Sequence, residues 1–140
     1  MRAIKPVVVD DTSLFSTSIP EDDYPVWAPG AYVVGDKRIK ITTHRIYECL
    51  VNTSDDPEVG VLAVLPTWLD LGATRPWRMF DGSISSQSDD TSNIVVVLEP
   101  GRTISSVSSF NIEGVSSINI KMVDPLEGEV YNRDVVLQDN

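Results

Sequence analysis

Hydrophobic and polar residues alternate with a period of two over much of the second half of the chain. The clearest case is SINIKMVD, where Ile118, Ile120 and Met122 alternate with polar side chains. Because successive side chains of a strand point to opposite faces, this pattern predicts a strand with one buried face. Runs of β-branched or alternating residues predict further strands at 94–100, 103–114 and 128–137.

The turns between these runs also point to a β-rich fold. EPGR and DPLEG combine Pro and Gly, which interrupt strands and favour tight turns. Short strands separated by such turns are typical of an antiparallel sandwich. We therefore predict an all-β protein in which residues 66–140 form an antiparallel sandwich.

The first half of the chain is less regular. Residues 1–25 hold two predicted features. The run around Pro6 predicts an edge strand, because proline cannot donate a hydrogen bond to a β-ladder. The acidic, proline-containing stretch after it predicts an irregular arm. A hairpin turn at Gly35-Asp36, followed by a strand-like run, predicts a small β-module over residues 26–65. The short apolar run at 59–66 fits either a loop or a strand.

Composition narrows the function classes. The chain has 140 residues, is 41% hydrophobic and carries a net charge of −10 spread over both halves. Clustered basic residues are needed to bind phosphate, so nucleic acid and anionic lipid are poor partners. No run approaches the roughly 18 apolar residues of a membrane span. The N-terminus also lacks the apolar stretch of a signal peptide.

The residues give no support to an enzyme. Cys49 is the one cysteine and lies among apolar residues, so it is predicted to pack in the core, with a catalytic thiol as the alternative. The acidic doublets lack the ligand spacing of a calcium loop and are predicted to be solvated loop residues. No zinc spacing, phosphate loop or nucleophile elbow occurs. We predict no catalytic residue, no metal and no cofactor.

The stretch WLDLGATRPWRMFDG, residues 68–82, concentrates aromatic and charged residues. We predict that Trp68 begins a strand and that Trp77 packs in the core of the sandwich. Arg75 and Arg78 are expected to pair with the aspartates of the same stretch, Asp70 and Asp81. A sugar-binding platform is the alternative interpretation of the two tryptophans.

Residues 27–49 follow the skeleton W-x-x-G-x-Y-x-x-G-D and then Y-x-C, which resembles small chitin- and cellulose-binding modules. The resemblance implies a three-stranded, aromatic-rich sheet whose rings stack on sugar rings. The same aromatics are also needed as the core of so small a module, and this role is favoured for Trp27 and Tyr32. The candidate glycan-binding residues are Trp27, Tyr32, Tyr47, Trp68 and Trp77.

From residue 26 to 137 the order of motifs is similar to that of tailed-bacteriophage tail-fibre or baseplate-associated proteins. The most specific pieces are the Trp68–Asp81 stretch and NIEGVSSINIKMVD followed by GEVY. This resemblance implies a jelly-roll-like form for the sandwich of residues 66–140. It also implies a virion component that is assembled in the host cytoplasm. Its partners would be other tail subunits, with homo-oligomers on the virion and docking through the N-terminal arm and sandwich edges. The alternative is a tail adhesin that binds polysaccharide on the host surface.

Overall fold

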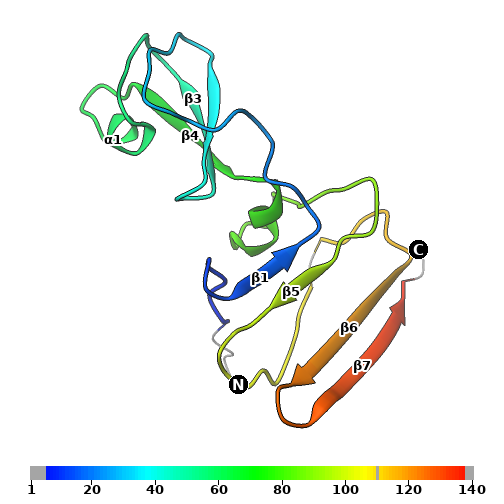
Figure 1. Ribbon diagram of the computed structural model, residues 1–140. Coiled ribbons are helices and arrows are strands. Elements are labelled where there is room, and N and C mark those ends of the chain that lie inside the picture. The colour runs from blue at the N-terminus through cyan, green and yellow to red at the C-terminus, as the bar shows by residue number, and fades with distance from the viewer. Residues whose placement is uncertain (1–5, 110, 138–140) are drawn as a thin grey trace, which may run out of the picture. The chain divides into compact units, whose positions relative to one another are not determined.

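The computed structural model describes residues 6–109 and 111–137, and these form an all-β chain of short strands with two short helices (Figure 1). The chain divides into two compact units, Met1–Ser106 and Val107–Asn140. The first unit holds two small sheets and both helices, and the second holds one hairpin. The prediction of an all-β chain is confirmed.

A three-stranded antiparallel sheet organises the first unit. Its strands are β2 (Lys37–Lys40), β3 (Arg45–Cys49) and β4 (Trp68–Ala73), in the order β2-β3-β4. A turn over residues 41–44 joins β2 to β3, and His44 adopts a left-handed φ of 53° there. Histidine is among the few non-glycine residues enriched in this conformation.

The core of this sheet is aromatic. Tyr32, Tyr47, Cys49 and Trp68 form one buried cluster. The rings of Tyr32 and Trp68 meet edge to face, with their centroids 5.2 Å apart, a geometry that aromatic quadrupoles favour. A module with few residues thus obtains its core from a few large rings.

A short helix, α1 (Pro57–Val61), packs beside this core. Asp56 caps its N-terminus by accepting a hydrogen bond from the Glu58 N–H, and proline occupies the first turn. Gly60 lies against the Trp68 ring so closely that a Cβ would fall 2.5 Å from indole Cδ1. The predicted loop or strand at 59–66 is therefore corrected: it begins as a helix, which a capping aspartate and a proline start.

The predicted boundary between modules 26–65 and 66–140 is also corrected. β4 lies after that position, yet it pairs with β3 along its length. Arg45 is opposite Ala73 at one end of the ladder, and Cys49 is opposite Trp68 at the other. Trp68, 1% exposed, fills the core of the earlier sheet. A division at residue 65 would remove this side chain and one strand from the module, so the three-stranded sheet extends across the boundary.

The second small sheet joins distant segments. β1 (Leu14–Thr17) pairs antiparallel with β5 (Val96–Leu98). Part of the predicted irregular arm is thus a strand. Of the predicted N-terminal strand, residues 1–5 lie outside the described chain and residues 6–10 are not in a strand. The described residues of the predicted strand at 103–114 are irregular as well.

The second unit is a hairpin of β6 (Ser117–Asp124) and β7 (Gly128–Val136). Burial alternates along β6, with Ile118, Ile120 and Met122 on its more covered face. The prediction of a half-buried strand there is confirmed, as is the turn between β6 and β7. The described residues form sheets of two or three strands each.

Candidate functional site

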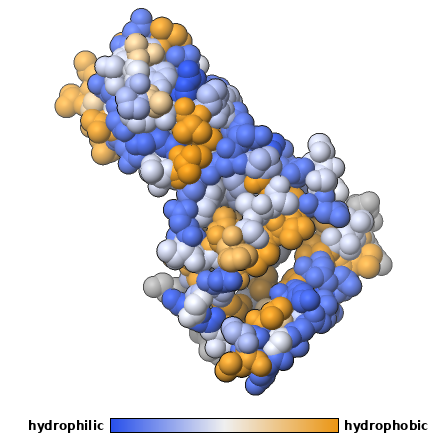
Figure 2. All heavy atoms as spheres, in the orientation of Figure 1, coloured by the Kyte–Doolittle hydropathy of each residue, from blue (hydrophilic) through white to orange (hydrophobic). Residues whose placement is uncertain are grey.

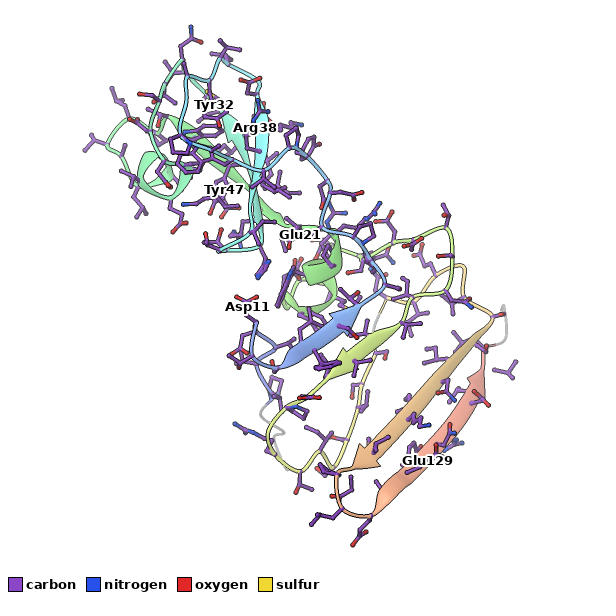
Figure 3. All side chains as sticks on the ribbon, viewed as in Figure 1. Asp11, Glu21, Tyr32, Arg38, Tyr47 and Glu129 are labelled. Atoms are coloured by element: carbon purple, nitrogen blue, oxygen red, sulfur yellow. The ribbon has the colours of Figure 1, made fainter. Side chains whose placement is uncertain are left out.

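The five candidate glycan-binding aromatics divide into two groups. Tyr32, Tyr47 and Trp68 are buried at 8%, 3% and 1% exposure, so their ring faces are unavailable to a sugar. Their prediction as glycan contacts is corrected: the module needs these rings as its core. Figure 3 shows Tyr32 and Tyr47 among the side chains of the sheet.

Trp27 is partly exposed but engaged. It packs against the core cluster, and the Lys40 ammonium lies 5.2 Å from its ring centroid, within cation–π range. Lys40 is itself held by the carboxylates of Asp56 and Glu58. Burial lowers the pKa of Lys40, but hydrogen bonds to these two carboxylates outweigh it and raise the pKa overall. The indole face is therefore occupied by an anchored side chain.

Trp77 lies in a separate cluster, on the 3-10 helix η1 (Arg75–Phe80). The imidazole of His44 stacks on its indole with centroids 3.9 Å apart, and the Phe80 ring meets it edge-on at 6.2 Å. The prediction that Trp77 packs in the core of the sandwich is wrong: its side chain is half-buried on η1, outside the buried core, and packs on a histidine. One face of the indole is covered.

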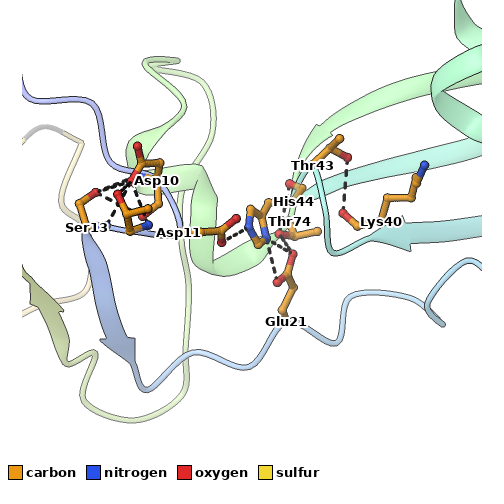
Figure 4. Close-up of polar contacts among 9 residues, drawn as sticks. Asp10, Asp11, Ser13, Glu21, Lys40, Thr43, His44 and Thr74 are labelled. Carbon is orange, nitrogen blue, oxygen red and sulfur yellow. Dashed lines mark hydrogen bonds and ion pairs between the residues drawn. The ribbon is translucent and has the colours of Figure 1, made fainter.

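His44 is held by carboxylates on both sides (Figure 4). Its Nδ1 lies 3.0 Å from Glu21 Oε1, and its Nε2 lies 2.7 Å from Asp11 Oδ1. The Glu21 carboxylate also accepts a hydrogen bond of 2.7 Å from the hydroxyl of Thr74, a residue that is fully buried. Residues 11 and 21 of the predicted arm are therefore bound to the turn between β2 and β3, and residue 21 also to Thr74, which follows β4.

Two further aspartates extend this contact to η1. Asp23 accepts from the Arg75 backbone N–H at 2.9 Å and from Arg78 Nη2 at 2.8 Å. Asp22 pairs with Arg75 at 3.3 Å. We call this set the acidic clasp: the carboxylates Asp11, Glu21, Asp22 and Asp23 with their partners His44, Thr74, Arg75 and Arg78.

The acidic clasp corrects the predicted ion pairs of Arg75 and Arg78. Neither arginine pairs with Asp70 or Asp81; Asp70 instead binds Arg45 across the β3–β4 ladder. Sequence proximity favoured the nearer aspartates, whereas the fold brings those of residues 22–23 to the arginines. The available signal was the density of acidic residues at positions 10–23.

A polar cavity of about 420 Å³ opens beside β4. Leu71 provides an apolar part of its wall. The polar lining residues are Arg45, Arg78, Asp81, Ser83, Ser85 and Ser86. Both arginines are already paired with aspartates, so the cavity presents serine hydroxyls, the Asp81 carboxylate and neutralised guanidinium groups.

The ionisable groups show no arrangement for nucleophilic catalysis in the described part of the chain. Both nitrogens of His44 face carboxylates rather than a hydroxyl or thiol. Cys49 is fully buried, donates to the Val51 carbonyl at 3.0 Å, and has a pKa raised by that burial. Its predicted core position is confirmed. A raised pKa disfavours the reactive thiolate.

The described residues contain no group of three or more His, Cys, Asp or Glu side chains placed to hold a metal ion. Neither is there, within 6–109 and 111–137, a helix with the length and apolar content needed to cross a membrane.

Comparison of the chain with protein-family models, with curated proteins and with solved structures found no match. The resemblance to phage tail proteins and to small polysaccharide-binding modules therefore remains a prediction from the motifs.

Proposed function

We propose that this chain is a non-enzymatic structural component of a tailed-phage virion that attaches, or forms part of, a tail fibre or baseplate. Its partners are other tail subunits, with further copies of itself on the virion. On this proposal, the hairpin of β6 and β7 belongs to a jelly-roll-like sandwich. The motif order from residue 26 to 137 supplies the biological setting.

The observation that supports this proposal over an adhesin is the state of the aromatic side chains. An adhesin that stacks sugars needs several rings facing solvent. Here three of the five candidate rings are buried. The fourth, Trp27, lies under the Lys40 ammonium, and the fifth, Trp77, is stacked against the His44 imidazole. These rings stabilise the fold, which suits a protein whose task is to hold a position in an assembly.

Immunogold electron microscopy of purified phage particles tests the proposal. With antibody raised against this chain, we expect label at the tail–fibre junction or at the baseplate. Label at distal fibre tips would support an adhesin instead. Particles without label would remove the virion assignment.

The polar cavity beside β4 favours a second candidate, a glycan-binding adhesin. Serine hydroxyls and planar guanidinium groups suit the hydroxyls of a saccharide, and Leu71 offers an apolar contact. Titration with oligosaccharides followed by NMR would test it. Shifts confined to Arg45, Leu71 and Ser83–Ser86 would support binding in the cavity, and an unchanged spectrum would count against it.

A further inference from the structure

The segment from α1 to β4 exposes most of its large apolar side chains, although Val61 packs against the core. Among residues 59–66, which we call the apolar loop, Val59 is 67%, Leu62 85%, Val64 100% and Leu65 84% exposed. Apolar surface at the α1 end of the module is visible in Figure 2. Single exposed apolar residues are ordinary, whereas a contiguous group on a folded protein marks an interaction surface.

The backbone of the apolar loop is anchored at both ends. The Thr67 N–H donates to the Gly60 carbonyl at 3.1 Å, so one hydrogen bond closes the loop. The Thr67 hydroxyl and the Trp68 indole N–H both donate to Asp55, at 3.1 Å each. The apolar side chains therefore project from a fixed frame, and a partner that covers them has little backbone to order.

A second apolar segment adjoins the base of the loop. The Leu50 N–H donates to the Thr67 carbonyl at 2.9 Å, which places Leu50 next to the end of the loop. Leu50 and Val51 are 42% and 46% exposed. The surface thus draws on two segments of the chain.

The charges beside the loop restrict its occupant. Three carboxylates lie at its base, those of Asp55, Asp56 and Glu58. Lys40 binds two of them, so the base of the loop keeps two net negative charges. A second copy would bring the same carboxylates together, and an anionic membrane would repel them, in a chain of net charge −10.

We propose that the apolar loop docks into an apolar recess, bordered by Lys or Arg side chains, on a neighbouring subunit of the particle. The loop supplies the desolvated centre of the interface. The carboxylates at its base face the basic border and set the orientation. This inference rests on the proposed function, because the neighbouring subunit belongs to the same virion.

Incorporation into particles tests the inference. A phage whose gene for this chain is deleted is complemented by expression of the full chain in the host. The amount of the chain in gradient-purified particles is then measured by immunoblot. We expect the double variant Leu62→Asp/Val64→Asp to lower incorporation about tenfold or more, as loss of an interface centre does. The matched control is Leu126→Asp, because Leu126 is 96% exposed in the β6–β7 turn; it should incorporate like wild type.

The outcomes separate the inference from the proposed function. If wild type is incorporated and the double variant enters particles equally well, the docking inference is wrong while the virion role stands. If wild type is absent from particles, the virion role itself fails. Thermal unfolding of the purified variants, expected to match wild type because both side chains are exposed, shows that lost incorporation does not come from lost folding.

Further measurements test the occupant. The double variant Asp55→Asn/Glu58→Gln neutralises two carboxylates at the base of the loop, keeps oxygen acceptors there and should lower incorporation several-fold. Unchanged incorporation would overturn the basic border of the partner. Sedimentation equilibrium of wild type should show no dimer that depends on the loop. A dimer present in wild type and lost in the Leu62→Asp/Val64→Asp variant would identify a second copy of the chain as the occupant. Flotation with phosphatidylcholine–phosphatidylglycerol vesicles should leave the chain unbound, and binding through the loop would overturn the protein partner.

Discussion

The imidazole of His44 stacks on the indole of Trp77, with ring centroids 3.9 Å apart and ring planes 21° apart. His44 comes from the turn between β2 and β3, whereas Trp77 belongs to η1. Two carboxylates from the N-terminal segment hold the same imidazole. This one side chain therefore joins the N-terminal segment, the sheet and η1.

A double-mutant cycle should detect this stack. We expect Trp77→Ala and His44→Ala each to destabilise the chain, and their combined effect to fall short of the sum by about 0.5–1.5 kcal/mol, the range for paired rings. Urea unfolding of the four proteins, followed by far-ultraviolet circular dichroism, measures the coupling. Strict additivity would show that the stacked geometry contributes nothing beyond separate packing.

Loss of Glu21 should weaken the acidic clasp more than loss of its neighbour. Glu21→Ala removes the charged acceptor of the buried Thr74 hydroxyl, which keeps only its longer hydrogen bond of 3.3 Å to the His44 carbonyl. A hydrogen bond to a charged group contributes about 1.5–3 kcal/mol. The control Asp22→Ala removes a carboxylate whose side chain is 67% exposed, so its cost should be at most about 1 kcal/mol. Urea midpoints compare the two, and equal midpoints would contradict a structural role for Glu21.

The strands of the second unit were accessible to sequence reasoning because their signal is local. Period-two alternation at Ile118, Ile120 and Met122 coincides with the observed burial of β6. The Pro- and Gly-containing turn then defines the start of β7. Each signal lies within one strand or one turn, and no distant partner is needed to interpret it.

The module boundary and the acidic clasp were not accessible in this way. The register of β3 with β4 joins Cys49 to Trp68 across an intervening helix and loop. The chain offers Arg78 a choice of 21 acidic residues, and the nearer of its two observed partners, Asp23 at 2.8 Å, is 55 positions away in the sequence. Non-local pairing depends on the whole fold, so neither spacing nor composition identifies it.

Gly60 should resist replacement, because neighbouring side chains leave no room for a Cβ. A Cβ at this position would lie 2.3 Å from Thr67 Oγ1 and 2.5 Å from Trp68 Cδ1, and overpacking of this kind costs about 1–3 kcal/mol. At Gly30 the nearest atom to a Cβ is 3.8 Å away, so Gly30→Ala serves as the control. Thermal unfolding should show a lowered midpoint for Gly60→Ala alone, and similar midpoints would contradict the close approach of α1 to Trp68.

Lys40 should make the stability of the module depend on pH in the alkaline range. Burial lowers its pKa, but hydrogen bonds to Asp56 and Glu58 raise it further, so the folded pKa lies above its ordinary value. A group of this kind stabilises the folded state fully below its unfolded pKa of about 10.4, and the stabilisation is lost as the pH rises through the folded pKa. We therefore expect the free energy of unfolding of wild type to fall above about pH 10.4 more steeply than that of Lys40→Met. Urea unfolding across this pH range measures both slopes. Glu58→Gln, which removes one charged partner of Lys40, should give an intermediate slope. Three parallel curves of unfolding free energy against pH would show that the Lys40 ion pairs do not stabilise the fold.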